Sequence, residues 1–220
     1  MRDAGRALVE VVGGRLSTGP ARWPIHLEGT GLDPGALAAA FASASRFLGK
    51  APLSPSARES QLLRAAGLDW PIAHVGIDEA TRMALLVKAA DRAGEAELVS
   101  LVEDLYRRGE NRERQSVLRS LPLLPRPERF LALAVDSCRT SVQPIFEAIA
   151  CENPYPAAFF PEPSFNQMVL KALFIEVALE RILGLQRRIT PELRRMAKDY
   201  PSERAAAGRS IPKDIALLGS

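Results

Sequence analysis

Apolar residues recur along most of the chain at the spacing of amphipathic α-helices. The pattern is most regular after Asp78, where apolar side chains at i, i+3, i+4 and i+7 share one helix face. These side chains are Met83, Leu86, Val87 and Ala90. Asp78 stands before them, where an N-cap residue is expected. The sequence therefore predicts a helix that begins at Asp78.

Similar patterns, bounded by Gly, Pro or capping residues, predict further helices. They cover Asp33–Leu48, a short segment that ends at Gly67, the segment between Gly94 and Gly109, Glu110–Leu121, Leu131–Cys138, Val142–Ile149 and a segment that starts at Thr190. No alternation of β-branched residues competes with them, so we predict an all-α fold. Short connections make neighbouring helices antiparallel. The hairpins suit either HEAT-like, α-solenoid-like repeats or a compact helical domain.

The N-terminal third is the least regular part of the chain. A short apolar patch, Ala7–Val12, is followed by Gly13-Gly14 and a run that resembles a loop and contains His26. With no second polar partner nearby, His26 is not expected to be a ligand or a base. We therefore divide the chain into a less regular helical and loop region, 1–77, and a helical core with a basic C-terminal segment, 78–220. We expect these regions to form one continuous domain.

Composition places the chain among soluble globular proteins. Of its 220 residues, 47% are hydrophobic and 25% are charged, and the net charge is +3. From Arg181 onward there are nine Lys or Arg residues against four Asp or Glu. Such a tail can attract phosphates, nucleic acid or anionic lipid, but we favour arginines that solvate helix ends. With no signal peptide and no run long enough to span a membrane, the expected location is the cytoplasm.

The segment Cys151–Phe174 has the most unusual composition. Four prolines occur in it, and each one restricts φ and removes a backbone donor, so we expect a stiff loop before the next helix. Such a loop could present Asn153 and Tyr155 to a ligand. It could equally bridge two helices over an apolar surface, and the structural interpretation is slightly favoured.

The helix that follows this loop carries the strongest candidate for a binding residue. Ser164 and Gln167 match a capping box, and apolar side chains then fall on nearly every side, which is typical of a buried helix. Gln167 and Lys171 share one edge, with Asn166 further round. A buried lysine needs a partner. Lys171 therefore faces solvent, pairs with a carboxylate, or binds an anionic ligand together with the neighbouring amides.

Four arginines are further candidates for ligand binding. Arg139 closes a predicted helix, whereas Arg195, Arg204 and Arg209 follow Thr190. The last three could converge on a phosphate or carboxylate, which the planar guanidinium group favours. They could also pair with the nearby carboxylates, namely Glu192, Glu203 and Asp214. The second interpretation requires no ligand and is favoured.

Several long strings of the sequence resemble the EboA family. They are NPYP, FPE, FNQMVLKALF, GENRERQSVLRSL and PELRRMAKDYPSERAAAGRSIPKDI, and the similarity is strongest from Asp78 to Ile215. The resemblance implies a protein encoded in ebo gene clusters beside a UbiA-like membrane prenyltransferase and other enzymes. It also implies a role in making or moving a secondary-metabolite precursor of terpenoid type. It assigns no catalytic residue.

The chain lacks the common catalytic strings. No GxSxG, P-loop, GxGxxG or HExxH occurs, and with two histidines and two cysteines we expect no metal and no cofactor. We therefore predict a non-catalytic adaptor, carrier or scaffold that works with ebo-cluster enzymes. One alternative is an unrecognised enzyme acting on a phosphorylated or carboxylated molecule at Lys171, Gln167 and Asn153. A helical repeat that binds nucleic acid is a weaker alternative, because the basic excess is small.

Overall fold

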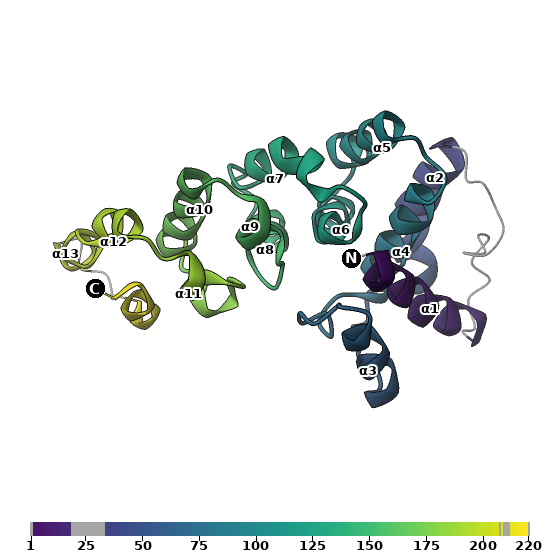
Figure 1. Cartoon of the computed structure of the whole chain (residues 1–220), viewed down its shortest axis with the longest axis horizontal. Helices are drawn as coiled ribbons and strands as arrows, with labels where there is room; N and C mark the ends of the chain where they lie inside the picture. The colour runs from purple at the N-terminus through teal and green to yellow at the C-terminus, as the bar shows by residue number, and fades with distance from the viewer. Residues whose placement is uncertain (1, 19–33, 207, 209–211, 220) are drawn as a thin grey trace. The chain divides into compact units, whose positions relative to one another are not determined.

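The computed structural model describes residues 2–18, 34–206, 208 and 212–219. Helices dominate these ranges, and the only extended pairing described is an isolated bridge between Pro52 and Gly76. The prediction of an all-α fold is confirmed (Figure 1). The HEAT-like arrangement stays a prediction.

Contacts divide the chain into two compact units, unit 1 (Met1–Leu133) and unit 2 (Ala134–Ser220). The helices of unit 1 are α1 (Arg2–Thr18), α2 (Pro34–Leu48), α3 (Ala57–Ala65), α4 (Ile77–Ala90), α5 (Glu95–Arg108), α6 (Asn111–Ser120), η1 (Leu121–Leu123) and η2 (Pro127–Phe130). The boundary falls within α7 (Leu131–Ser137). Unit 2 continues with α8 (Gln143–Ala150), α9 (Tyr155–Phe159), α10 (Glu162–Phe174), η3 (Leu179–Arg181), α11 (Leu185–Arg188), α12 (Pro191–Ala197), α13 (Tyr200–Ala206) and η4 (Lys213–Leu218). The division at residue 77 stays a prediction.

Helix α4 is the centre of unit 1. It packs against α1, α2 and α6, and every residue from Asp78 to Val87 is buried. An amphipathic pattern with one apolar face does not anticipate burial on all sides. The polar residues of α4 must therefore find partners inside the unit.

The expectation of an irregular N-terminus is wrong for residues 2–18, which form α1. Several of its apolar residues, including Leu8 and Val12, are fully buried. Gly5 faces α4, where a Cβ would lie 2.9 Å from Val87 Cγ1. Glycine therefore lets the two helices approach closely, and their packing outweighs the low helix propensity of the glycines. Figure 1 shows α1 beside α4. His26 lies outside the described residues.

Two predicted helix starts are corrected. Gly76 is the N-cap of α4, and its N–H donates to the Glu79 carboxylate at 3.3 Å, so Asp78 lies inside the helix. Helix α10 begins at Glu162, before Ser164, so Ser164 and Gln167 form no capping box. The predicted start at Thr190 is confirmed, because its hydroxyl accepts a hydrogen bond from the N–H of Leu193 at 3.2 Å.

Two helices of unit 2 are followed by a glutamate in the left-handed region. Glu152 follows the C-cap of α8 with φ +47°, and Glu176 follows the C-cap of α10 with φ +61°. Glycine is the usual residue at such a position, and another residue there costs roughly 1 kcal/mol. Each glutamate pairs with an arginine further along the chain: Glu152 with Arg181 at 2.7 Å, and Glu176 with Arg204 at 2.6 Å. These pairs offset the strain and join the end of α8 to η3 and the end of α10 to α13.

Candidate functional site

The C-terminus of α10 forms one wall of the candidate site. The N–H of Val177 donates to the Ala172 carbonyl at 2.8 Å, and the N–H of Glu176 donates to the Leu173 carbonyl at 3.3 Å. These two bonds form a Schellman motif, which ends the helix and directs the chain into η3. The motif leaves the Glu176 carboxylate at the surface, with 62% of its side chain exposed.

Arg204 attaches α13 to this helix end. Only 6% of the residue is exposed, its Nη2 donates to Glu176 Oε1 at 2.6 Å, and its guanidinium lies 5.8 Å from the ring centroid of Tyr200. The Tyr200 hydroxyl donates to the Leu173 carbonyl at 2.8 Å. A buried guanidinium and a helix end are therefore fixed by the same group of contacts.

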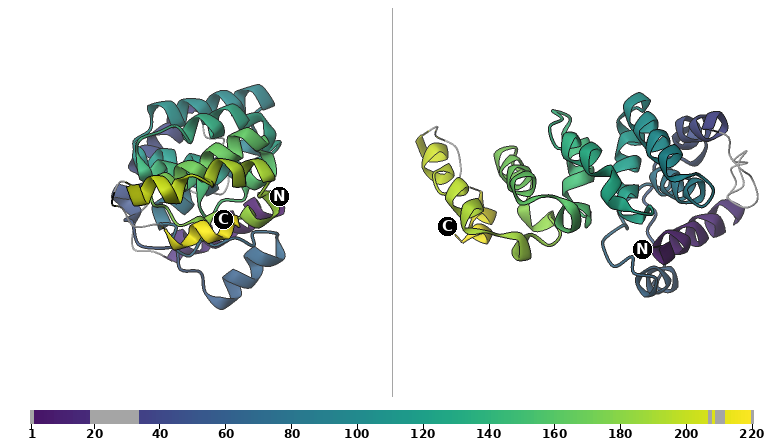
Figure 2. Two further views of the ribbon diagram at one scale, coloured as in Figure 1. Left: turned by 90° about the vertical axis from the view of Figure 1, so that its left-hand side faces the viewer. Right: turned by 45° about the horizontal axis from the view of Figure 1, so that its top comes forward.

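A pocket of about 470 Å³ lies between these elements, and we call it the α10–η4 pocket. It is lined by Leu173, Glu176, Val177, Ala178, Glu180, Arg204, Pro212, Asp214, Ala216 and Leu217. Figure 2 shows η4 beside α12 at the C-terminal end of unit 2. Asp214 accepts a hydrogen bond from the N–H of Leu179 at 2.7 Å, which holds η4 against η3. Most lining residues are apolar, with a few charged groups among them, as is usual for small-molecule sites.

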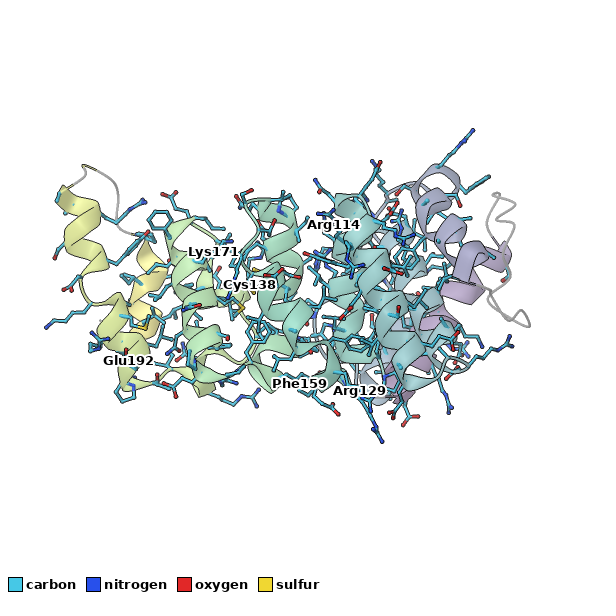
Figure 3. All side chains as sticks on the ribbon, turned by 90° about the horizontal axis from the view of Figure 1, so that it is seen from above. Arg114, Arg129, Cys138, Phe159, Lys171 and Glu192 are labelled. Carbon is cyan, nitrogen blue, oxygen red and sulfur yellow. The ribbon has the colours of Figure 1, made fainter. Side chains whose placement is uncertain are left out.

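Lys171, the strongest candidate from the sequence, has backbone partners. Its Nζ donates to the carbonyls of Cys138 and Thr140, both at 2.5 Å, and lies 4.9 Å from the ring centroid of Phe146. Figure 3 shows Lys171 close to Cys138. The pKa of Lys171 lies below its ordinary value, because burial disfavours the charged amine. The carbonyls follow the end of α7, where a cation also suits the helix dipole. These contacts match a structural role.

Replacing Lys171 by Ala is expected to lower the free energy of unfolding by about 1–3 kcal/mol. The change removes two charge-assisted hydrogen bonds and leaves carbonyl oxygens without their donor. Chemical denaturation measures the loss. Lys198→Ala is the control, because Lys198 is exposed. Unchanged stability of Lys171→Ala together with a lost metabolite would contradict the structural role and favour a ligand at this lysine.

Asn153 and Tyr155 lie inside unit 2, at 2% and 0% exposure. The Asn153 amide donates to the Ala148 carbonyl at 2.9 Å and accepts from the N–H of Tyr155 at 3.0 Å. The Tyr155 ring packs against Phe159 and Phe160, with centroids 4.8 Å and 6.2 Å away. The proline-rich segment therefore contains a short helix, α9, whose first residue is part of the core.

The other two amides of the predicted edge lie in different surroundings. Gln167 is exposed, whereas Asn166 is 2% exposed and its Oδ1 is buried with no hydrogen-bond partner among the described residues. Phe174 is 68% exposed on the same side of α10 as Gln167, so the helix is not buried all round as predicted. The structure does not bring Asn166, Gln167 and Lys171 together on one inward-facing edge.

The arginines predicted to bind a ligand also have different surroundings. Arg139 is exposed, and Arg195 is exposed and pairs with Glu192 at 2.6 Å. Arg204 lines the α10–η4 pocket, and Arg209 lies outside the described residues. Pairing with a carboxylate, the favoured alternative, is therefore present for Arg195 and Arg204, although the partner of Arg204 is Glu176. Of the predicted binding residues that the structure describes, Arg204 is the one that lines this pocket. A ligand role for the others stays a prediction.

Sequence reasoning missed a buried charge network in unit 1. Asp78, fully buried, accepts hydrogen bonds from Arg82 at 2.9 Å and from Arg112 at 2.5 Å. Glu79 pairs with Arg112 at 3.2 Å and with Arg119 at 2.5 Å. The only signal in the sequence is the i, i+4 spacing of Asp78 and Arg82, which is common on exposed helix surfaces. We assign the network to packing of α2, α4 and α6, because its groups pair with one another.

No group of three or more His, Cys, Asp or Glu residues that could hold a metal ion occurs among the described residues. None of the described helices is both long enough and apolar enough to cross a bilayer. Burial raises the pKa of the Cys138 thiol to about 12, so this thiol is neutral at pH 7 and a poor nucleophile.

Comparison with known proteins gives one match. The family model described as "Metabolite traffic protein EboA" matches residues 30–218. No curated protein and no solved structure matches the chain.

Proposed function

Because the chain belongs to the EboA family, we propose that it is a non-catalytic helical carrier that holds a small metabolite in the α10–η4 pocket. The pocket is the observation that carries this proposal. Its volume of about 470 Å³ lies in the range of small-molecule sites. The family description, which refers to metabolite traffic, supports a role in binding and release.

The side chains that line the pocket support the binding of a metabolite over its catalytic conversion. Among the described residues, the lining includes carboxylates and one guanidinium, but no Ser, Cys, His or Lys side chain. A hydroxyl, thiol or amine nucleophile with an adjacent base, one usual arrangement for covalent catalysis, is therefore missing from the described part of the lining. Arg204 is occupied by Glu176, which leaves the apolar residues as the main contact surface for a ligand.

The pathway is part of the same proposal. The carrier passes a secondary-metabolite precursor of terpenoid type between ebo-cluster enzymes, including the UbiA-like membrane prenyltransferase. A largely apolar pocket suits a hydrocarbon body, and burial of that body supplies roughly 25 cal/mol per Å² of apolar surface. The alternative, an enzyme that uses Lys171 on an anionic substrate, requires this lysine to exchange its two carbonyl partners for the substrate.

Filling the pocket tests this function. Ala216 lines the pocket and is exposed, so Ala216→Trp is expected to occupy the space without disturbing the core. In cells that make the pathway product, this variant should lower the yield several-fold while the purified protein keeps its thermal stability. Ala158→Trp is the matched control, because Ala158 is also exposed but lies on α9, outside the pocket lining. Equal product yields from the two variants would contradict the proposal.

A further inference from the structure

We propose that the α10–η4 pocket selects an amphiphilic amine, with the protonated amino group at Glu176 and Glu180 and the apolar body against Leu173, Val177 and Leu217. This inference rests on the proposed function, because it names the chemical class of the carried metabolite. It differs from the anionic ligand that the sequence suggests for Lys171.

The charge of the lining favours a cation. Among the described residues, three carboxylates, those of Glu176, Glu180 and Asp214, line the pocket together with one guanidinium, that of Arg204. The net formal charge of these side chains is therefore negative. A bound carboxylate or phosphate would meet this excess of like charge, whereas an ammonium group would reduce it.

The three carboxylates also differ in whether they already have a hydrogen-bond or ion-pair partner within the protein. Glu176 pairs with Arg204, and Asp214 accepts the N–H of Leu179. Glu180 is exposed, and its side chain makes no hydrogen bond or ion pair with any residue in the described ranges. Its carboxylate can therefore accept a hydrogen bond from an ammonium group without breaking an existing contact.

The C-terminal end of α10 adds a negative electrostatic potential to that of the carboxylates. This helix, thirteen residues long, ends at Phe174, and Leu173 from its last turn lines the pocket. The C-terminal end of a helix carries a partial negative charge and stabilises cations near it. The helix end and the carboxylates therefore act in the same direction, independently of each other.

Apolar residues beside these charges suit the body of an amphiphile. Leu173 and Val177 are 1% and 3% exposed and form a packed wall, whereas Leu217 on η4 remains 36% exposed. An alkyl or terpenoid body lying between the wall and η4 would cover Leu217 and remove its apolar surface from water. The pocket thus has one surface for each part of an amphiphilic amine.

Calorimetric titration with three probes of equal chain length tests the charge preference. Octylamine, octanol and octanoate present an ammonium, a neutral hydroxyl and a carboxylate on the same alkyl body. At low ionic strength and pH 7, octylamine should bind about tenfold more tightly than octanol, which corresponds to about 1.4 kcal/mol, and octanoate should bind more weakly than octanol. Added salt should narrow these differences.

A pair of variants identifies the carboxylate responsible. Glu180→Gln keeps the size of the side chain and removes its charge, so it should weaken octylamine binding several-fold and leave octanol binding unchanged. Glu162→Gln is the control, since Glu162 is an exposed residue at the other end of α10 and does not line the pocket. It should leave all three affinities unchanged.

The outcomes separate this inference from the proposed function. Equal or tighter binding of octanoate, or an unchanged octylamine affinity in Glu180→Gln, would overturn the preference for amines. Octanol binding that is lost in Ala216→Trp would in that case still support a carrier with this pocket. If none of the three probes binds, both the inference and the proposed pocket are wrong.

Discussion

Replacing Asp78 by Asn is expected to lower the free energy of unfolding by about 3–5 kcal/mol, because the change leaves a buried guanidinium without its counter-charge. Arg82 is 1% exposed and donates to the Asp78 carboxylate, to the Phe41 carbonyl at 2.8 Å and to the Ser45 hydroxyl at 3.0 Å. The neutral amide of Asn replaces the size of the carboxylate but not its charge. Chemical denaturation of the purified variant measures the loss.

The chain offers a matched control for this prediction. Glu103 and Arg107 have the same i, i+4 spacing as Asp78 and Arg82, but their side chains are 45% and 67% exposed. Glu103→Gln should therefore cost less than about 1 kcal/mol, as is usual for exposed ion pairs. A loss of similar size in both variants would contradict a special contribution of the buried pair.

The dependence of folding stability on acidic pH gives a second test of the same network. Burial alone would raise the pKa of Asp78, but hydrogen bonds from Arg112 and Ser45 and the charge of Arg112 lower it to about 2. The folded-state pKa lies below the ordinary value of 3.8, so the stabilisation is complete above that value and is lost as the pH falls toward 2. Between pH 5 and pH 2, the stability of Asp78→Asn should therefore fall less steeply than that of the unchanged protein.

Replacing Tyr155 by Ala is expected to cost about 3–5 kcal/mol of folding free energy, because it empties a fully buried aromatic site. The ring packs at a tilt against Phe159 and edge-to-face against Phe160, and Tyr155 is the first residue of the short helix inside the proline-rich segment. Denaturant unfolding measures the effect. The half-buried Phe159, replaced by Ala, should cost clearly less and serves as the control.

A different outcome for Tyr155 would change its assignment. If Tyr155→Ala kept its stability within about 1 kcal/mol and lost a bound metabolite, the ring would be a ligand contact and not part of the core. The hydrogen bonds of Asn153 to Ala148 and from Tyr155 fix the turn before α9, so the backbone would then present the ring to a ligand.

Much of the helical fold is predictable from local sequence, and the failures have physical causes. Periodicity and caps located most helices, as Thr190 shows. Helix α1 was missed because its glycines lower local propensity, whereas packing of Gly5 against Val87 favours the helix. Asp78 was misread as an N-cap because a capping aspartate and an aspartate buried in an ion-pair network have the same local sequence pattern.

The candidate site was harder to predict, because its residues meet only in three dimensions. Leu173, Arg204 and Leu217 are distant in sequence, and no motif connects them. Arg204 was identified as a candidate, but its partner Glu176 was not, since a glutamate in the left-handed region has no signature in a single sequence. For Lys171, the sequence correctly predicted that the amine needs a partner but not which one. The partners are backbone carbonyl oxygens, whose positions cannot be predicted from a sequence pattern.

Native mass spectrometry of the purified protein tests the central claim, a metabolite held in the α10–η4 pocket, most directly. We predict that the protein from a producing cell carries a bound small molecule and that Ala216→Trp, purified in the same way, lacks it while Ala158→Trp retains it. The same bound mass in Ala216→Trp as in the unchanged protein would place the metabolite elsewhere and contradict the assignment of this pocket.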